Sequence, residues 1–380
     1  MKRTSAVLVV VVLAGAGPAA AEPRGGPVAV VRPAPQMGFA GVLRPKIEDK
    51  QTDGEIDCNS PAHWDGDIMY MFYSTGHPWR SSGPDFARLS RPSQRTAIDN
   101  DEEWHRGPKG EQGARWIEAT HKADDGKLYA WYHNEPPKIC GRDRLTAPRI
   151  GQMVSTDNGM NWHDQGLVLE APADSLNCET VNHYFVGGNG DFCVNVDNEK
   201  QYVYFFISTY NKDVTEQGVS LARMKYADRD EPKGKVFKWY KGRWDEPGIG
   251  GHVTPIFPAR IDWHQPEVDA FWGASVHWNT YLRQWVMLLN RARDKAWAQE
   301  GVYVSFSPEL GSAEAWSKPV KIVDARELVK FKWYPQVVGQ DAAARETDKL
   351  AGRKARLFVA GLSRWEIEFY KPGETKPAAE

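Results

Sequence analysis

Three carboxylic side chains, Asp57, Glu118 and Asp191, stand at comparable places in successive segments of the chain. Asp57 lies in EIDCNSP, Glu118 lies in RWIEATHK, and Asp191 follows the glycine-rich GGNG. Carboxyl groups crowded into a partly dry site take different pKa values, so that one is protonated while another is ionised. Hydrolysis of a glycosidic bond needs such a pair, an acid for the leaving oxygen and a base or nucleophile opposite it. We therefore expect these three residues to be catalytic.

Eight further residues have side chains that could hold a substrate beside these carboxylates. They are Asn59, His63, Trp116, Asp269, Trp272, His277, Trp333 and Tyr334. Trp116, Trp272 and Trp333 offer flat indole faces, which suit stacking on sugar rings. Asp269 would add a carboxylate from a fourth segment. His63 and His277 are equally well explained as buried, hydrogen-bonded core residues.

A repeat of short strands and polar turns predicts how these residues are brought together. Residues 59–74, 118–133 and 191–206 each have a tyrosine 11 positions after their first residue, with an Asp-Gly or Asp-Asn turn between. Residues 274–289 and 333–361 continue the pattern. The spacing of roughly 60–80 residues predicts an all-β fold, a five-bladed β-propeller of four-stranded antiparallel blades. Because the first strand of each blade lines the axis, we expect the candidate residues at one mouth of that axis.

Residues 155–162 (STDNGMNW) fit the pattern S-x-D-x-G-x-x-W and resemble the Asp-box of sialidases and other propellers. In those families the motif is a turn at the periphery of a blade, and its aspartate caps the hairpin. The motif therefore supports the propeller and implies nothing about catalysis.

Over most of residues 40–370 the chain resembles the five-bladed propeller glycosidases of the arabinanase, xylosidase and fructosidase type. The resemblance rests on Asn59-Ser60-Pro61 before Asp65-Gly66, on Gly190-Asp191-Phe192 and on Trp333-Tyr334-Pro335-Gln336. It implies a base or nucleophile at Asp57, a supporting aspartate at Asp191, and an acid on or near the fourth blade. The fourth repeat offers Glu267 and Asp269 there, and Glu118 on the second blade is additional to the family's pattern.

Composition narrows the classes of function. The 380 residues include 16 Trp, 14 Tyr and 14 Phe, and the formal net charge is -2. Since no basic excess exists to hold phosphates, we expect a carbohydrate partner and no nucleic acid. The sequence lacks G-x-S-x-G, P-loop, G-x-G-x-x-G and H-E-x-x-H motifs. We expect no required cofactor and no metal held by protein ligands in catalysis, although Ca²⁺ could occupy the central channel.

Two other functions stay open. A non-catalytic propeller that binds carbohydrate or a protein would use the aromatic residues and not the carboxylates. A sialidase-like enzyme would need an arginine cluster, a tyrosine nucleophile and six blades, whereas the sequence predicts five.

The two ends of the chain predict its processing and domain limits. Residues 1–21 combine Lys2 and Arg3 with an apolar stretch and end in Ala19-Ala20-Ala21, which predicts a signal peptide cleaved after Ala21. We therefore expect a secreted or periplasmic protein. The segment 22–37 is expected to be a flexible Pro/Gly-rich tether, 38–371 a single propeller, and 372–380 a flexible tail. We expect a monomer without membrane insertion, because no later apolar run reaches 18 residues.

Four cysteines follow the expected signal peptide, namely Cys58, Cys140, Cys178 and Cys193. Export permits disulfides. We favour a Cys140–Cys178 bond, because both residues lie in loop-like sequence that flanks one hairpin. Cys193 lies in an apolar strand, which predicts a buried thiol.

Overall fold

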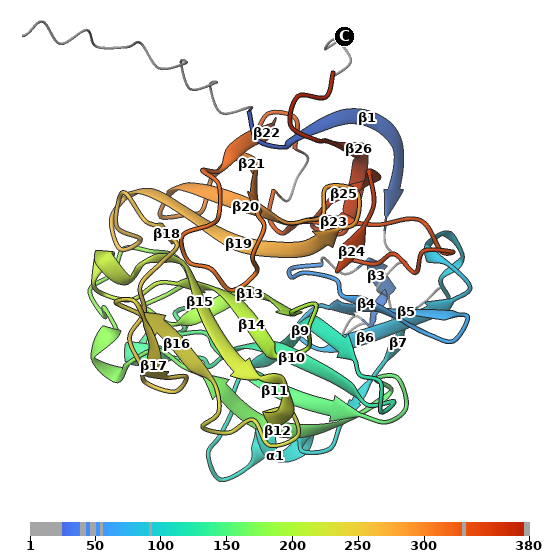
Figure 1. Ribbon diagram of the computed structural model, residues 1–380. Coiled ribbons are helices and arrows are strands. Elements are labelled where there is room, and N and C mark those ends of the chain that lie inside the picture. The colour runs from blue at the N-terminus through green and yellow to red at the C-terminus, as the bar shows by residue number, and fades with distance from the viewer. Residues whose placement is uncertain are drawn as a thin grey trace, which may run out of the picture.

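The computed structural model describes residues 25–38, 43–45, 51–53, 56–90, 93–328 and 332–375. The expected signal peptide and the last five residues of the expected tail lie outside the described residues. Within them, five mainly antiparallel sheets are arranged as the blades of a propeller (Figure 1). This arrangement confirms the predicted all-β, five-bladed fold.

Each blade steps outward strand by strand from an inner strand. Blade 1 contains β4 (Ala62–Asp65), β5 (Ile68–Ser74), β6 (Pro78–Gly83) and β7 (Gln94–Arg95). Blade 2 contains β9 (Ala114–Lys122), β10 (Leu128–Glu135), β11 (Arg149–Ser155), β12 (Asn161–Leu169) and β8 (Ala97–Ile98). Blade 3 contains β13 (Asn189–Val196), β14 (Tyr202–Thr209), β15 (Gly218–Lys225), β16 (Phe237–Tyr240), β17 (Arg243–Pro247) and β18 (Phe257–Pro258).

The remaining elements complete the ring. Blade 4 contains β19 (Glu267–Asn279), β20 (Gln284–Asp294), β21 (Gln299–Ser307) and β22 (Val320–Asp324), with β24 (Leu350–Ala351) paired to β19. Blade 5 contains β23 (Pro335–Val338), β25 (Lys354–Val359), β26 (Leu362–Tyr370) and β1 (Val28–Gly38). A separate hairpin joins β2 (Leu43–Pro45) to β3 (Gln51–Asp53). The helical elements are short: α1 (Asp101–Arg106) and 3₁₀ turns at Phe86–Arg88, Ile139–Gly141, Ala173–Ser175, Val214–Glu216 and Tyr226–Asp228.

Residues 28–37, expected to belong to a flexible tether, instead form most of strand β1. This strand pairs antiparallel with β26, from Val28 opposite Tyr370 to Gly38 opposite Leu362 (Figure 1). The pairing satisfies the backbone groups of both ends of the chain. Ala29 is buried in the core between blades 4 and 5. The propeller is therefore closed by a blade whose strands come from both ends of the described chain.

Removal of residues 25–38 is expected to lower the free energy of unfolding by about 3 kcal/mol or more, because it exposes the edge of β26 and uncovers apolar core. Urea unfolding of a chain that begins at residue 39, compared with one that begins at residue 25, measures the loss. Addition of a synthetic 25–38 peptide should restore part of it. Equal unfolding midpoints for the two chains would show that β1 contributes nothing to closure.

Apolar residues of neighbouring blades form the core between them. Between blades 2 and 3, Trp131 meets Phe205 edge-on, with ring centroids 5.9 Å apart. Between blades 3 and 4, Phe206 meets Trp316 in the same manner at 5.5 Å. These contacts fix the angle between blades and hence the positions of the inner strands.

A polar hydrogen bond recurs where one blade meets the next. The second strand of one blade carries, near its end, a side chain that accepts a backbone N–H. That N–H belongs to the inner strand of the next blade or to the residue just before it. The pairs are Ser74 with Ile117, His133 with Asp191, Ser208 with Gly273, and Asn290 with Tyr334. We call each of these an inter-blade bond. In three of the four pairs the acceptor has a hydroxyl or an amide, and in blade 2 it is an imidazole.

Residues 155–162 form the turn between β11 and β12. Asp157 Oδ1 accepts the backbone N–H groups of Met160 and Asn161, both at 3.0 Å. Gly159 supplies the positive φ of 79° that this tight turn requires. Trp162 is buried behind it. These contacts stabilise a hairpin at the end of the blade.

The cysteines follow the sequence prediction. Cys140 and Cys178 form a disulfide with Cα atoms 5.6 Å apart, whereas Cys58 and Cys193 are free and buried. Among the described residues, no helix is both long and apolar enough to span a membrane.

Candidate active site

Residues from two inner strands meet a histidine from a second strand at one mouth of the axis. Glu118 lies in β9, Asp191 in β13, and His133 near the end of β10. Each of the three is at most 3% exposed. His133 Nδ1 lies 3.3 Å from Glu118 Oε1 and 3.9 Å from Asp191 Oδ1. We call Glu118, His133 and Asp191 the axial cluster.

Asp191 adopts a left-handed backbone conformation that is uncommon for a residue with a side chain. Its φ is 41°, directly after Gly190, where β13 bulges. The hydroxyls of Tyr210 and Tyr334 donate to its two carboxylate oxygens. A Cβ atom on Gly190 would lie 2.6 Å from His133 Cε1, so glycine is needed for this close approach. Such local strain is typical of functional positions.

Hydrogen bonds define where protons lie in the axial cluster. The Asp191 backbone N–H donates to His133 Nδ1 at 3.0 Å, so the ring proton lies on Nε2, which faces Glu135 Oε1 at 3.2 Å. The Phe192 backbone N–H donates to Glu118 Oε2 at 3.0 Å. Glu118 Oε1 then faces His133 Nδ1. Because Nδ1 has a single lone pair, the neutral ring accepts the Asp191 N–H there, and only the charged ring can donate from Nδ1 to Glu118.

Burial dominates the electrostatics of the axial cluster. It raises the pKa of Glu118 from 4.5 to about 7, and the hydrogen bond from His133 offsets only part of this effect. Burial also raises the pKa of Asp191. For His133, burial disfavours the charged ring, but hydrogen bonds to Glu118 and Glu135 outweigh it and raise the pKa well above its ordinary value. The cluster therefore holds an exchangeable proton near neutral pH.

Glu135 connects the axial cluster with the surface. Its side chain is 33% exposed and contacts His133 Nε2, whereas Glu118 lies on the other side of the same ring. The edge of the Trp116 indole packs against His133, with ring centroids 5.6 Å apart. Glu118, His133 and Glu135 thus form a row that leads from the buried cluster toward solvent.

Asp57 is exposed at the same mouth, directly before the buried Cys58. Burial and the charges of Asp191 and Asp57 raise the pKa of Tyr334 well above its ordinary value. Burial and the charge of Asp57 also raise the pKa of Tyr184. The Asp57 carboxylate therefore lies within electrostatic reach of both tyrosines, on the solvent side of the axial cluster.

A depression lined by Tyr184 adjoins this mouth. It has a volume of about 750 Å³, and Arg142 and Arg144 contribute to its lining. Tyr184 is 38% exposed and packs edge-on against the half-buried Trp333, with centroids 6.1 Å apart. Aromatic surface and hydrogen-bond donors therefore lie beside the exposed Asp57, a combination that suits a sugar.

No family model and no curated protein sequence matches the chain. Similar solved structures include the arabinanase of Bacillus subtilis (13% identity, 83% of this chain and 94% of that one, TM-score 0.47). An exo-1,5-α-L-arabinanase from a bovine ruminal metagenomic library is 12% identical over 88% of this chain and 94% of its own, with a TM-score of 0.47. The α-L-arabinofuranosidase domain of Coprinopsis cinerea is 10% identical over 89% and 96%, with a TM-score of 0.45.

Three of the predicted residues lie together: Glu118 and Asp191 both approach His133, and Tyr334 donates to Asp191. Asp57 and Trp333 lie at the same mouth of the axis. Trp272 differs from the expected stacking wall, because its ring is fully buried. It packs against Trp297 with centroids 4.5 Å apart. No face is left for a sugar.

Four further expected binding residues lie away from the mouth or serve the fold. His63 is buried beside Phe72, and His277 is buried against Phe369, so both are core residues. Asp269 forms a two-point ion pair with Arg291, at 2.6 and 2.8 Å. Asn59 is buried and donates to backbone oxygens of blades 3 and 4, so it ties the inner strands together.

Sequence reasoning missed His133, Glu135, Tyr210 and Tyr184. A signal existed for His133, because it is the last residue of the repeat 118–133, where the first repeat has Ser74. Glu135 follows two residues later on the same strand. The loop residue Tyr184 and the strand-end residue Tyr210 carry no periodic signal that could have been read.

Buried polar atoms on or beside the inner strands suit water better than Ca²⁺. Buried atoms without a hydrogen-bond partner in the described structure include Asn59 Oδ1, Ser60 Oγ, Thr120 Oγ1, Asn195 Oδ1 and His277 Nε2. These five contribute no carboxylate, which Ca²⁺ sites normally use. In the axial cluster, backbone N–H and tyrosine O–H groups already occupy ligand atoms of His133, Glu118 and Asp191. A metal ion there would have to displace those hydrogen bonds.

Proposed function

We propose that this protein is a secreted glycoside hydrolase that acts on a plant or microbial glycan. The observation that carries the proposal is the axial cluster, whose carboxyl pKa values are raised by burial, next to the exposed Asp57. Such a site offers one protonated and one ionised carboxyl group, as glycosidic cleavage requires. The leader-like residues 1–21 support secretion.

Each group has a role that follows from its exposure and contacts. Asp57, exposed and facing solvent, takes the proton of the attacking water. When His133 Nδ1 gives up the Asp191 N–H, it takes the proton of Glu118, and the Nε2 proton passes to Glu135, which delivers it to the leaving oxygen. Asp191 is a positioning residue: its backbone N–H holds the neutral imidazole, and its charge stabilises the ring once Nδ1 is protonated.

The main alternative is a non-catalytic propeller that binds a glycan. The specific observation in its favour is that Glu118 and Asp191 are buried, whereas the aromatic surface at Tyr184 and Trp333 is accessible. A sialidase-type mechanism has less support, because Tyr210 and Tyr334 are buried with pKa values raised well above the ordinary value. Such hydroxyls are poor nucleophiles.

The deciding experiment is sugar release by the purified protein from a panel of polysaccharides and aryl glycosides. Asp191→Asn is assayed in parallel, with Glu199→Gln as control because Glu199 is exposed in a turn of blade 3. Release by wild type and the control but not by Asp191→Asn would support the hydrolase. Silence on the whole panel, with binding to one glycan by all three proteins, would support the binding propeller instead.

A further inference from the structure

A cavity of about 280 Å³ lies near the ends of three inner strands. Its lining includes Thr120 of β9, Asn195 of β13 and Trp278 of β19, each close to the last residue of its strand. Glu118 and Asp191 of the axial cluster precede Thr120 and Asn195 on the same two strands. The cavity therefore lies toward the other mouth of the axis, and we call it the far pocket.

Two polar side chains of the far pocket lack the partners that buried groups normally have. Thr120 Oγ1 and Asn195 Oδ1 are buried and have no hydrogen-bond partner in the described structure. Each of the two residues is 4% exposed. The other amide atom of Asn195 is engaged, because Nδ2 donates to the Val276 carbonyl at 2.9 Å. Since an unpartnered buried polar atom costs free energy, these two atoms mark a place where a hydroxyl group of a ligand or of water is needed.

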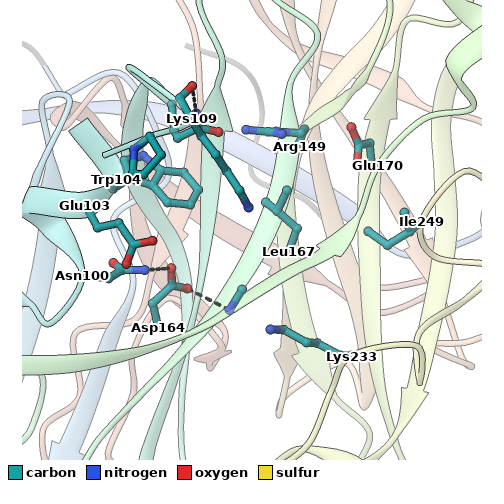
Figure 2. Close-up of a pocket in the computed structure, with 13 residues that line it drawn as sticks. Asn100, Glu103, Trp104, Lys109, Arg149, Asp164, Leu167, Glu170, Lys233 and Ile249 are labelled. Carbon is teal, nitrogen blue, oxygen red and sulfur yellow. Dashed lines mark hydrogen bonds between the residues drawn. The ribbon is translucent and has the colours of Figure 1, made fainter. Parts of the chain in front are cut away.

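A larger cavity, of about 490 Å³, lies on blade 2 beside α1 and differs in this respect (Figure 2). Asp164 in its wall already accepts a hydrogen bond from Asn100 at 2.7 Å (Figure 2). Among the described residues, no side chain that lines this larger cavity has a buried polar atom without a partner. Its charges also balance, because three carboxylates stand against three cations: Glu103, Asp164 and Glu170 against Lys109, Arg149 and Lys233. Of the two cavities, only the far pocket has groups that lack a partner.

The charged side chains of the far pocket already have partners within the protein. Lys200 and Lys349 each form an ion pair with an aspartate outside the lining. The Asp197 carboxylate accepts two backbone N–H groups of its own turn, at 2.7 and 3.0 Å. Burial lowers the pKa of His121 to about 4, so its ring is neutral at pH 7. The far pocket therefore selects neither an anion nor a cation, and a neutral ligand fits it.

Trp278 supplies a fixed aromatic wall. Its backbone N–H donates to the Lys349 carbonyl at 2.9 Å, and its ring packs against Trp285 with centroids 5.2 Å apart. Trp278 is half-buried, whereas Trp285 is 5% exposed. A partly open, immobile indole suits the apolar C–H face of a sugar ring. The volume, just below the range of about 300–1,000 Å³ that is typical of drug-sized ligands, suits one small ring.

We infer that the far pocket is a second carbohydrate site, which binds one neutral sugar residue without cleaving it. Sugar hydroxyls both donate and accept, so one ring can satisfy Asn195 Oδ1 and Thr120 Oγ1 while its C–H face lies on Trp278. The site is separate from the proposed hydrolysis, because it lies at the other mouth of the axis. A hydrolase would use it to retain a glycan, and a non-catalytic propeller would use it to bind one.

The test is an NMR titration that observes the indole N–H group of Trp278. The neutral probes are D-galactose, L-arabinose and D-xylose, and the charged probe is D-glucuronate. The signal that disappears in Trp278→Phe is assigned to Trp278. The pocket variant is Thr120→Val, which removes only the unpartnered hydroxyl. The matched control is Thr146→Val, which removes another buried, unpartnered threonine hydroxyl outside the far pocket.

At least one neutral sugar should shift the Trp278 signal of wild type and of Thr146→Val, with a millimolar Kd. Thr120→Val should bind the same sugar about fivefold more weakly, because one hydrogen bond to the ring is lost. Three results would overturn the inference: no shift by any neutral sugar at about 100 mM, equal affinity of the two valine variants, or equal affinity for D-glucuronate. The titration involves no turnover, so a failure of the proposed hydrolysis would be seen separately, in the sugar-release assay.

Discussion

The Asp57→Asn variant is expected to lose about 10²–10⁴-fold in kcat for the glycan that wild type hydrolyses, with little change in thermal stability. Asp57 is exposed, so its replacement by the isosteric amide creates no cavity. Asparagine cannot take the proton of the attacking water, and the loss therefore falls on the chemical step. Initial rates over a range of substrate concentrations separate kcat from KM.

Chemical rescue makes this prediction sharper. A small external nucleophile such as azide should restore part of the Asp57→Asn rate, because it needs no base to remove a proton. Glu199→Gln should keep the wild-type rate and should gain nothing from azide. If Asp57→Asn retains more than about half of the wild-type kcat, Asp57 is not the base.

The Glu118→Gln variant is expected to separate the role of the axial cluster in catalysis from its effect on stability. Glutamine can keep the bond from the Phe192 N–H and carries no charge beside His133 Nδ1, so it imitates protonated Glu118. It has no proton to release. We expect a large loss of kcat together with loss of the decline in activity that wild type should show above pH 7.

The sign of the stability effect follows from the raised pKa of Glu118. The folded protein binds more protons than the unfolded chain between pH 4.5 and about 7, so wild-type stability falls as pH rises through this window. The glutamine cannot ionise and escapes this penalty. We expect Glu118→Gln to be more stable than wild type at pH 8, by on the order of 1–3 kcal/mol, and to match it near pH 4.5.

Urea unfolding of both proteins at the two pH values measures this difference. Glu199→Gln is again the control, because Glu199 is exposed in a turn of blade 3. Parallel stability curves for wild type and Glu118→Gln would show that ionisation of Glu118 does not oppose folding.

The five repeats could be predicted from the sequence because the alternation of residues in a strand and the Asp-Gly turns are features of short segments of the chain. The place of Glu118, Asp191 and Tyr334 at the axis followed from their register in those repeats. Two other features depend on contacts between distant segments. Strand β1 is recognisable only through its partner β26, and burial of Trp272 depends on Trp297 from another hairpin.

The sequence predicted two members of the axial cluster, Glu118 and Asp191, and missed the third, His133. Inner-strand residues could be identified by counting from the repeat, whereas His133 lies on the second strand and reaches the axis by crossing to the next blade. Tyr210 follows the second strand of blade 3, and its contact with Asp191 depends on the strained backbone at that residue. Side chains of a regular strand alternate between its two faces, and a bulge interrupts this alternation. The direction of the Asp191 side chain could therefore not be predicted from the alternation of residues in the sequence.

The inter-blade bond at His133 shows how a repeated architecture can gain reactivity without being rebuilt. Ser74, Ser208 and Asn290 hold the same kind of joint with groups that do not titrate in water. The inter-blade bond at His133 also involves a group that can carry a proton, and it holds the next inner strand in the same way as the other three. The other inter-blade bonds could carry the same exchange: a histidine in place of Asn290 would put an imidazole beside the Tyr334 backbone N–H. Propellers of this kind are therefore scaffolds on which chemistry can be moved from one sector of the ring to another.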